Sequence, residues 1–335
     1  MSRDAMSEPT RWGPWHDRLH RQLLHEPQLL PDGQALLLAV SGGQDSMALM
    51  SLLVGMRHLH SWNLSIWHGD HGWHERSGEI ARNLANWCRS QNLPVQVSQA
   101  STGEAGSEAT ARKWRYQELQ KLAERESRDV VTGHTATDRA ETILLQMARG
   151  SDLAGLGSLR SQRPLEATRP KGPQLRRPLL QFNRSETAAI CRDLHLPIWI
   201  DPSNNNPGFA RNRIRQQVFP VLEDLHPGST SRMANLAERL SQVRDSQWEL
   251  SVLALQQLRN SHRGLNRRAL GELQHPTRRT LLATWLKQQG VPTIDASLLE
   301  QLSHRLALGE PGGRCDLPGR WTLHWQGADL LLSQF

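Results

Sequence analysis

The 335-residue chain has few cysteines and no long apolar segment. Its three cysteines, Cys88, Cys191 and Cys315, lie far apart, so the sequence has no CxxC motif for a metal or redox site. Scarce cysteine suits a reducing cytoplasm. The sequence also lacks an N-terminal apolar signal region and any run of about 18 apolar residues. We therefore expect a cytoplasmic protein with neither a signal peptide nor a membrane span.

The charge balance is basic, with 40 Lys and Arg against 33 Asp and Glu, a net charge of +7. A surplus of positive charge favours a polyanionic partner such as RNA, provided that the basic residues cluster. A soluble protein that happens to be basic would have the same composition. The length allows a sizeable core and indicates two domains.

The N-terminal half alternates short apolar runs with segments of helical periodicity. This alternation predicts an α/β fold, with a parallel doubly wound sheet that carries helices on both faces. In such sheets ligands bind beyond the carboxyl ends of the strands. The expected strands are 35–40, 63–68, 94–98 and 129–133, and the expected helices are 46–58, 77–90, 107–125 and 137–149.

The rest of the sequence predicts loops, helices and a terminal hairpin. Three glycines over 149–157 predict a loop. The basic, proline-containing segment 160–177 predicts a mobile or RNA-facing loop, with a solvated loop as the alternative. A smaller, mainly helical second domain is expected toward the C-terminus. Further helices are predicted over 184–195 (capped by Asn183 or Ser185), 229–260 and 277–308, and a hairpin over 321–332.

The apolar run 35–40 is followed directly by Ser41-Gly42-Gly43-Gln44-Asp45-Ser46. Two glycines let backbone N–H groups converge on an anion, and the N-terminus of the next helix adds the positive end of its dipole. The loop is not a Walker A motif, because no Gly-Lys-Ser/Thr follows. A carboxylate beside bound phosphates makes sense if a divalent cation lies between them. The pattern predicts a phosphate site, with a tight strand-to-helix turn as the alternative.

A second motif runs from Gly133 to Thr142. If the helix includes them, His134, Asp138 and Glu141 lie at i, i+4 and i+7 on one face. Two carboxylates and an imidazole facing one cleft can hold Mg²⁺ and position an amine. The alternative is a solvent-facing polar stripe. A phosphate loop predicted nearby favours the first interpretation.

Arginines carry the remaining two motifs. Arg112 and Arg115 share a helix face in 108–116, where guanidinium and aromatic planes suit an unpaired base. A turn containing Asp201 and Asn204 precedes 211–215, where arginines enter a helix start that favours acidic residues. This placement indicates a bound anion. Helices with exposed arginines are the alternative for both motifs.

The loop SGGQDS resembles the pyrophosphate loop of the N-type ATP pyrophosphatases. Taken in order with His68-Gly69-Asp70-His71-Gly72, EATARKWRY, GHTATDRAETILLQMARGSDLAGLGSL and DPSNNNPGFARNRIR, it makes residues 35–222 similar to tRNA(Ile)-lysidine synthetases. Residues 230–335 loosely resemble the smaller helical domain of that family. The resemblance implies an extension over 1–25, a PP-loop catalytic domain over 26–222 and a helical tRNA-binding domain over 223–335, without the extra C-terminal domain of longer members.

The resemblance also implies a reaction. Members ligate lysine to C2 of the wobble cytidine (position 34) in the CAU anticodon of tRNA(Ile), through an adenylated cytidine, with ATP and Mg²⁺. The implied catalytic residues are Asp45, Asp138, Glu141 and His134, with Asp45 and Asp138 at the metal. The implied ATP-binding residues are Ser41, Gly42, Gly43, Gln44, Asp45, Ser46, His68 and Arg211, and the implied tRNA-binding residues are Arg112, Arg115, Asp201, Asn204 and Arg213.

Departures from the family pattern occur in two motifs. The usual His-His-x-Asp-Asp is here His134-Thr135-Ala136-Thr137-Asp138, so no role is assigned to Thr135 or Thr137. The usual Leu-Glu-Ala-Arg-Ala-Arg is here Ser-Glu-Ala-Thr-Ala-Arg, so that Thr110 replaces the first arginine and Arg112 keeps the second. A rival interpretation, a cytidine thiolase, normally requires clustered cysteines, which the chain lacks. A non-catalytic RNA-binding protein is the rival of another class, and a homodimer stays open.

Overall fold

The computed structural model describes residues 12–73, 75–101, 104, 107–199, 208–260 and 264–334. The chain divides into two compact units, Met1–Ser241 and Gln242–Phe335. The functional boundaries inferred from the sequence, at 25/26 and 222/223, stay predictions. Within the described ranges no helix combines the length and the apolar character needed to cross a membrane.

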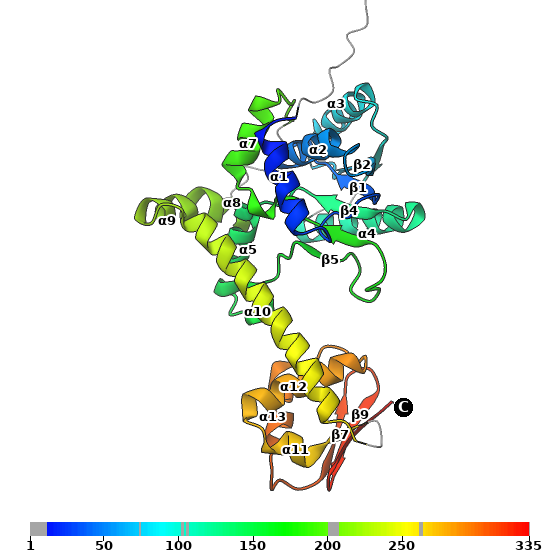
Figure 1. The fold of residues 1–335 in the computed structure, drawn as a ribbon, viewed down its shortest axis with the longest axis vertical. Helices are drawn as coiled ribbons and strands as arrows, with labels where there is room; N and C mark the ends of the chain where they lie inside the picture. The colour runs from blue at the N-terminus through cyan, green and yellow to red at the C-terminus, as the bar shows by residue number, and fades with distance from the viewer. Residues whose placement is uncertain are drawn as a thin grey trace, which may run out of the picture. The chain divides into compact units, whose positions relative to one another are not determined.

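The first unit contains a six-stranded sheet in the order β3-β2-β1-β4-β6-β5 (Figure 1). All neighbours pair in parallel except the edge strand β5, which is antiparallel to β6. The parallel fold and its four expected strands are confirmed. The strands are β1 (Ala35–Ala39), β2 (Asn63–Asp70), β3 (Val95–Gln99), β4 (Asp129–Thr132), β5 (Gln162–Pro164) and β6 (Gln174–Arg176).

Helices cover both faces of this sheet because alternate strand residues point to opposite sides. Leu36 and Leu38 of β1 face a core built with helices α1, α2, α3 and α7, whereas Leu37 faces a second core built with α4. Asn183 caps α7, since its side chain accepts a hydrogen bond from the Glu186 amide. The helices are α1 (Pro14–His25), α2 (Gln44–Met56), α3 (Ser77–Ser90), α4 (Glu108–Glu126), α5 (Ala136–Ala148), α6 (Leu153–Leu156), α7 (Arg184–Asp193), α8 (Ala210–Arg213) and α9 (Phe219–Leu225).

Two sequence expectations in this unit need correction. The loop expected over 149–157 contains the single-turn helix α6, which Asp152 caps by accepting a hydrogen bond from Gly155 N at 3.0 Å. The segment 160–177 is not an open loop, because both of its ends form strands and β6 pairs with β4. Arg176 and Arg177 are buried rather than available to RNA.

The long helix α10 (Ser229–Gln257) runs across the division between the units. The second unit then packs helices against a four-stranded antiparallel sheet in the order β7-β10-β9-β8. The terminal hairpin is confirmed as β9 and β10, and the helix expected over 277–308 is two helices. Its elements are β7 (Leu265–Asn266), α11 (Arg267–Glu272), α12 (His275–Gln288), α13 (Ala296–Arg305), β8 (Gly313–Leu317), β9 (Trp321–Gln326) and β10 (Asp329–Gln334).

Candidate active site

The loop between β1 and α2 is ordered by its own serines. Ser46 Oγ donates to Gly43 O at 2.9 Å and accepts from Ser41 N at 3.1 Å, while Gly43 N donates to Ser41 Oγ at 3.3 Å. Gly42 has φ +87°, a backbone conformation that favours glycine. Gly43 is the N-cap of α2, so the amides of 44–46 occupy the first turn, where no intrahelical acceptor exists. These amides are available to an anion.

Two close contacts place this loop against its neighbours. Trp199 N donates to Gly42 O at 3.0 Å, and the indole lies along the Gly42 backbone. At the end of β4, a Cβ on Gly133 would lie 2.9 Å from the carbonyl oxygen of Asp45. Only glycine allows this approach, which holds the start of α5 beside the start of α2.

Asp45 is held by α7, a contact that the sequence did not reveal. Arg184 Nη1 lies 2.6 Å from Asp45 Oδ2, and Thr187 Oγ1 donates to Oδ1 at 2.5 Å. The Gln44 side chain also turns to α7, donating to Arg184 O at 2.8 Å. Burial, aided by the charge of Asp138, raises the pKa of Asp45 against the lowering effect of Arg184. The carboxylate thus carries negative charge that its surroundings only partly compensate.

His134 lies outside the helix, which corrects the expectation of three residues on one helical face. Thr135 is the N-cap of α5, and the helix begins at Ala136. His134 Nδ1 lies 2.8 Å from Thr132 Oγ1. Burial, and then the charge of Arg177, lowers the pKa of His134 to about 3, so this imidazole is neutral at pH 7.

Asp138 forms a capping box with Thr135. The Asp138 Oδ2 atom accepts hydrogen bonds from Thr135 N at 2.7 Å and from Thr135 Oγ1 at 2.8 Å. Burial would raise the pKa of Asp138, but His134 and these two hydrogen bonds lower it. Thr137 also has a role, because its Oγ1 accepts a hydrogen bond from Arg184 N at 3.1 Å. The two threonines therefore support the site without standing in for the family's histidine and aspartate.

Glu141 is fully buried, so the alternative of a solvent-facing stripe is wrong at this position. Arg215 Nη2 lies 2.6 Å from Glu141 Oε1, and Arg211 Nη1 lies 3.6 Å from Oε2. Among the described residues, Oε2 has no hydrogen-bond partner. Burial, together with the charge of Asp138, raises the pKa of Glu141 to about 7 despite both arginines.

Two arginines of the segment 211–215, Arg211 and Arg215, approach Glu141 rather than an open surface. Arg211 donates to Thr142 Oγ1 at 3.2 Å, and Arg215 follows in a π-helical turn over 214–218. Such turns are rare in proteins overall, and those that occur are often found at functional sites. Arg213 is exposed. Arg215 was included in the arginine motif of the sequence, but it was assigned no role of its own and its pairing with Glu141 was not predicted.

Arg112 and Arg115 of α4 have different partners. Arg115 Nη2 lies 3.0 Å from His71 Nε2, while the Arg112 guanidinium is exposed and lies 5.1 Å from the centre of the Tyr116 ring. His68 is buried, and its Nδ1 donates to Val40 O at 2.8 Å. Asp201 and Asn204 lie outside the described residues.

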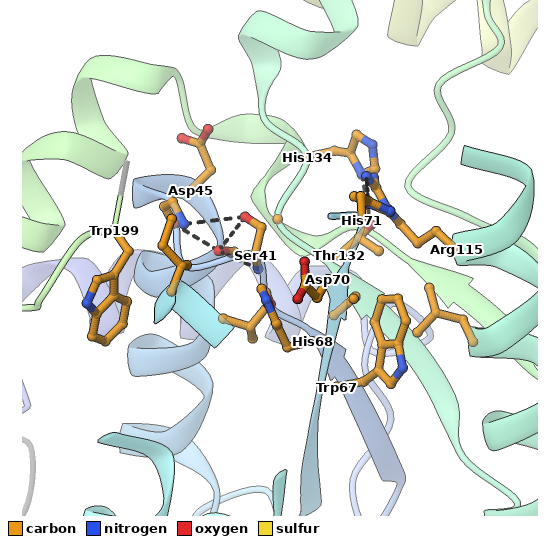
Figure 2. A pocket seen from close by; sticks show the side chains of 18 of the residues that line it. Ser41, Asp45, Trp67, His68, Asp70, His71, Arg115, Thr132, His134 and Trp199 are labelled. Carbon is orange, nitrogen blue, oxygen red and sulfur yellow. Dashed lines mark hydrogen bonds between the residues drawn. The ribbon is translucent and has the colours of Figure 1, made fainter. Parts of the chain in front are cut away.

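One cavity of about 280 Å³ brings the predicted motifs together (Figure 2). Of the predicted site residues, Ser41, Gly43, Asp45, Ser46, His68, Arg115, His134 and Asp138 line it. Figure 2 shows the Asp45 carboxylate pointing away from Ser41 and His68. Further residues of the lining include Trp67, Asp70, His71, Trp73, Thr132 and Trp199. Gly42, Gln44, Glu141, Arg112, Arg211 and Arg213 are not part of this lining.

The donors at this site fit a hard divalent cation. Asp45 and Asp138 offer carboxylate oxygens, the ligands that Mg²⁺ takes together with substrate phosphates. The two carboxylates repel each other, since the negative charge of Asp138 contributes to the raised pKa of Asp45. A cation shared by the two would relieve this repulsion.

Comparison with known proteins identifies the family of each unit. A family described as a PP-loop domain matches residues 16–222, and one described as a TilS substrate binding domain matches residues 265–329. The tRNA(Ile)-lysidine synthase of Parasynechococcus marenigrum is 65% identical over 96% of this chain and 95% of its own length. The protein of the same name from Prochlorococcus marinus strain SARG is 42% identical over 94% of each chain.

A solved structure of the U34-tRNA thiolase NcsA from Methanococcus maripaludis, with its [4Fe-4S] cluster, shares the fold. It aligns with a TM-score of 0.56 over 68% of this chain and 79% of its own, at 19% identity. Family matches and close relatives cover both units, whereas this neighbour supports the fold alone. The chain belongs to the tRNA(Ile)-lysidine synthase family of PP-loop ligases.

Proposed function

We propose that this chain uses ATP to join lysine to C2 of the wobble cytidine in tRNA(Ile) with a CAU anticodon. The observation that carries the proposal is that residues of the phosphate loop, Asp138 and His134 line one cavity. These residues follow β1 and β4, two strands that are distant in sequence but pair side by side, so they meet at the carboxyl ends of the strands. Both substrates of an adenylation reaction would meet there.

In the first step, ATP lies with its pyrophosphate against the amides of 44–46 at the start of α2. The cytidine O2 attacks the α-phosphorus, the bond to the bridging oxygen breaks, and pyrophosphate leaves. The helix dipole favours the negative charge that develops on the leaving group. Asp45 and Asp138 would hold Mg²⁺, which supplies further positive charge for the phosphates.

In the second step, the ε-amine of lysine attacks C2 and the bond from C2 to the adenylate oxygen breaks, releasing AMP. The amine must first lose a proton, because an ammonium has no lone pair. Glu141 suits this role, since a pKa of about 7 lets a carboxylate accept a proton near neutral pH. Asp138, with a lowered pKa, suits binding of the ammonium, and neutral His134 can accept or donate a hydrogen bond.

The arginines divide between the two substrates. Arg211 would neutralise the adenylate phosphate, and an anion there would draw this arginine away from Glu141 and make that carboxylate more basic. Arg115, in the cavity, and Arg112, on the exposed side of α4, would hold the extruded cytidine and its neighbours. Arg213, Asp201 and Asn204 would contact the tRNA.

Thiolation is less well supported. A thiolase of the kind that carries an iron–sulfur cluster needs cysteine ligands close together. Cys88 and Cys191 are buried and Cys315 belongs to the second unit, and none joins a metal-ligating group in the described ranges.

Incorporation of labelled lysine into an isoleucine tRNA transcript, with ATP and Mg²⁺, tests the proposal. Labelling should require ATP and should disappear when position 34 is uridine. AMP release without labelling would keep the adenylation and exclude lysine as the nucleophile. The absence of both signals would contradict the proposal and favour an RNA-binding role.

A further inference from the structure

We propose that the second unit carries a binding site for a divalent transition-metal ion, most suited to Zn²⁺, formed by His275, Glu300 and His304. One ligand atom from each of these residues lies within 4.8 Å of the other two. The site is separate from the cavity of the first unit, and no step of the proposed reaction uses it.

The distances from the two histidines to Glu300 are close to those between ligands of one metal ion. His275 Nε2 lies 3.3 Å from Glu300 Oε1, and His304 Nε2 lies 3.7 Å from the same oxygen. Tetrahedral Zn²⁺ with bonds of about 2.0–2.1 Å places its ligand atoms about 3.3–3.4 Å apart. Two imidazole nitrogens and one carboxylate oxygen form a typical three-residue zinc set, with the fourth position left for water.

The state of His275 supports a metal over a simple ion pair. Its Nε2 atom is buried and makes no hydrogen bond among the described residues, although Glu300 Oε1 is only 3.3 Å away. A protonated histidine paired with glutamate would be expected to direct its N–H at the carboxylate. The approach of His275 Nε2 to Glu300 Oε1 without a hydrogen bond instead fits two neighbouring ligands of one metal ion.

The helices hold these ligands in place before any ion binds. His275 is the first residue of α12, and Glu300 and His304 lie one turn apart on α13. Buried Arg278 joins the helices by donating to Ser303 O at 2.6 Å, and Ser303 Oγ donates to His275 O at 3.3 Å. Both helices belong to the second unit (Figure 1). The backbone positions of the three ligands are therefore fixed, and binding requires only small rotations of their side chains.

Arg279 orients the carboxylate. Its Nη1 lies 3.2 Å from Glu300 Oε2, which leaves Oε1 facing the two histidines. Contacts of this kind fix a metal ligand in its binding orientation. The imidazoles of His275 and His304 lie 4.2 Å apart between ring centroids, and the Nε2 atom of each approaches the same oxygen of Glu300.

Zinc titration of the untagged, metal-stripped full chain tests this proposal, with a chromophoric chelator as competitor. His304→Gln and Glu300→Gln should each bind one equivalent of Zn²⁺ less tightly, by more than the roughly 10–100-fold that loss of an outer-shell partner costs. His304 is 68% exposed, so its substitution should leave folding intact. His324→Gln, on β9 in the same unit, is the matched control and should bind as the wild type does.

Two further readouts do not depend on catalysis. Co²⁺ should give the visible absorption of a tetrahedral site in the wild type and in His324→Gln, and not in His304→Gln. Zn²⁺ should raise the Tm of the first two proteins and leave that of His304→Gln unchanged. Equal stoichiometry and affinity in all variants, or no zinc bound by the wild type, would overturn the proposal.

Discussion

The two ends of strand β4 place buried carboxylates in opposite circumstances. At its start, Asp129 is completely paired: Oδ1 accepts from Gln174 N at 2.7 Å, and Oδ2 lies 2.6 Å from Arg176 Nη2. Arg176 in turn donates to the backbone oxygens of Gln28 and Leu29. Beyond the end of β4, Glu141 is fully buried with one oxygen that lacks a hydrogen bond among the described residues.

The difference in hydrogen bonding between Asp129 and Glu141 distinguishes a structural charge from a candidate functional one. Buried polar groups are almost always satisfied, so an unsatisfied carboxylate requires an explanation. Groups with strongly shifted pKa values concentrate at functional sites, although structural networks shift them too. Glu141 and Asp45, whose pKa values are both raised, lie at the carboxyl edge of the sheet. Ionisation of Glu141 and Asp45 therefore costs stability, a cost that the proposed reaction would explain, whereas Asp129 at the opposite edge is fully paired.

The largest expected effect is on stability at the structural edge. Arg176→Met leaves Asp129 buried without a cation, and should lower the free energy of unfolding by about 3–5 kcal/mol. Urea unfolding measures this loss. Arg169→Met is the control, because Arg169 belongs to the same segment but is 63% exposed, and its pairs with Glu124 and Glu166 should contribute at most about 1 kcal/mol. Equal losses of stability in the two variants would contradict the claim that the buried Arg176–Asp129 pair is a structural one.

Asp45→Asn should have the next largest effect, at the functional edge. Loss of its charge should slow tRNA-dependent AMP formation by roughly 10²–10³-fold, the range seen when one electrostatic stabiliser of a transition state is removed. Binding of tRNA should change little. Asp224→Asn, at an exposed position of α9, is the control and should retain wild-type rates. Normal turnover by Asp45→Asn would refute the metal assignment.

Glu141→Gln separates the two steps of the proposed reaction. Adenylation should persist, while lysine transfer should slow by about 10²-fold, as for loss of a general base. Because only the ionised carboxylate accepts a proton, the wild-type transfer rate should rise with pH up to about 7, the pKa of Glu141. Single-turnover assays across this range measure both effects. An unchanged pH profile in the variant would exclude Glu141 as the base.

Arg112→Ala should have the smallest effect. An exposed guanidinium that contacts RNA is expected to contribute about 1 kcal/mol, so KM for tRNA should rise roughly fivefold while KM for ATP stays unchanged. Lys113→Ala, exposed beside it, tests whether any lost positive charge has the same result. Equal losses for tRNA and ATP would contradict a base contact by Arg112.

Local patterns sufficed to predict most of the fold. Alternating strands and helices, the glycine loop at Gly42 and Gly43 and the Asn183 cap are all determined by neighbouring residues, and all are present in the structure. Strand β6 was missed because its three residues become a strand only by pairing with β4, a partner distant in sequence. The same long-range pairing buries Arg176, which composition alone had suggested for RNA.

The candidate site was predictable as a set of motifs but not as a network. The sequence placed Asp45, Asp138 and His134 near strand ends, and the structure brings them into one cavity. Arg184 and Arg215 were not predicted as partners, since an exposed arginine and a paired one look alike in sequence. Thr135 was left without a role because its capping function appears only once α5 is seen to begin at Ala136.

The free energy of unfolding of Glu141→Gln tests the central claim most directly. Since burial raises the pKa of Glu141 from its usual value of 4.5 to about 7, its ionisation lowers stability as the pH rises through this range. Glutamine removes this cost, and Arg215, 26% exposed, can be solvated without its partner. We predict that at pH 8 the variant is as stable as the wild type or more stable, with any loss no greater than about 1 kcal/mol. A loss of about 3–5 kcal/mol, as expected for Arg176→Met, would show that Glu141 is a structural charge.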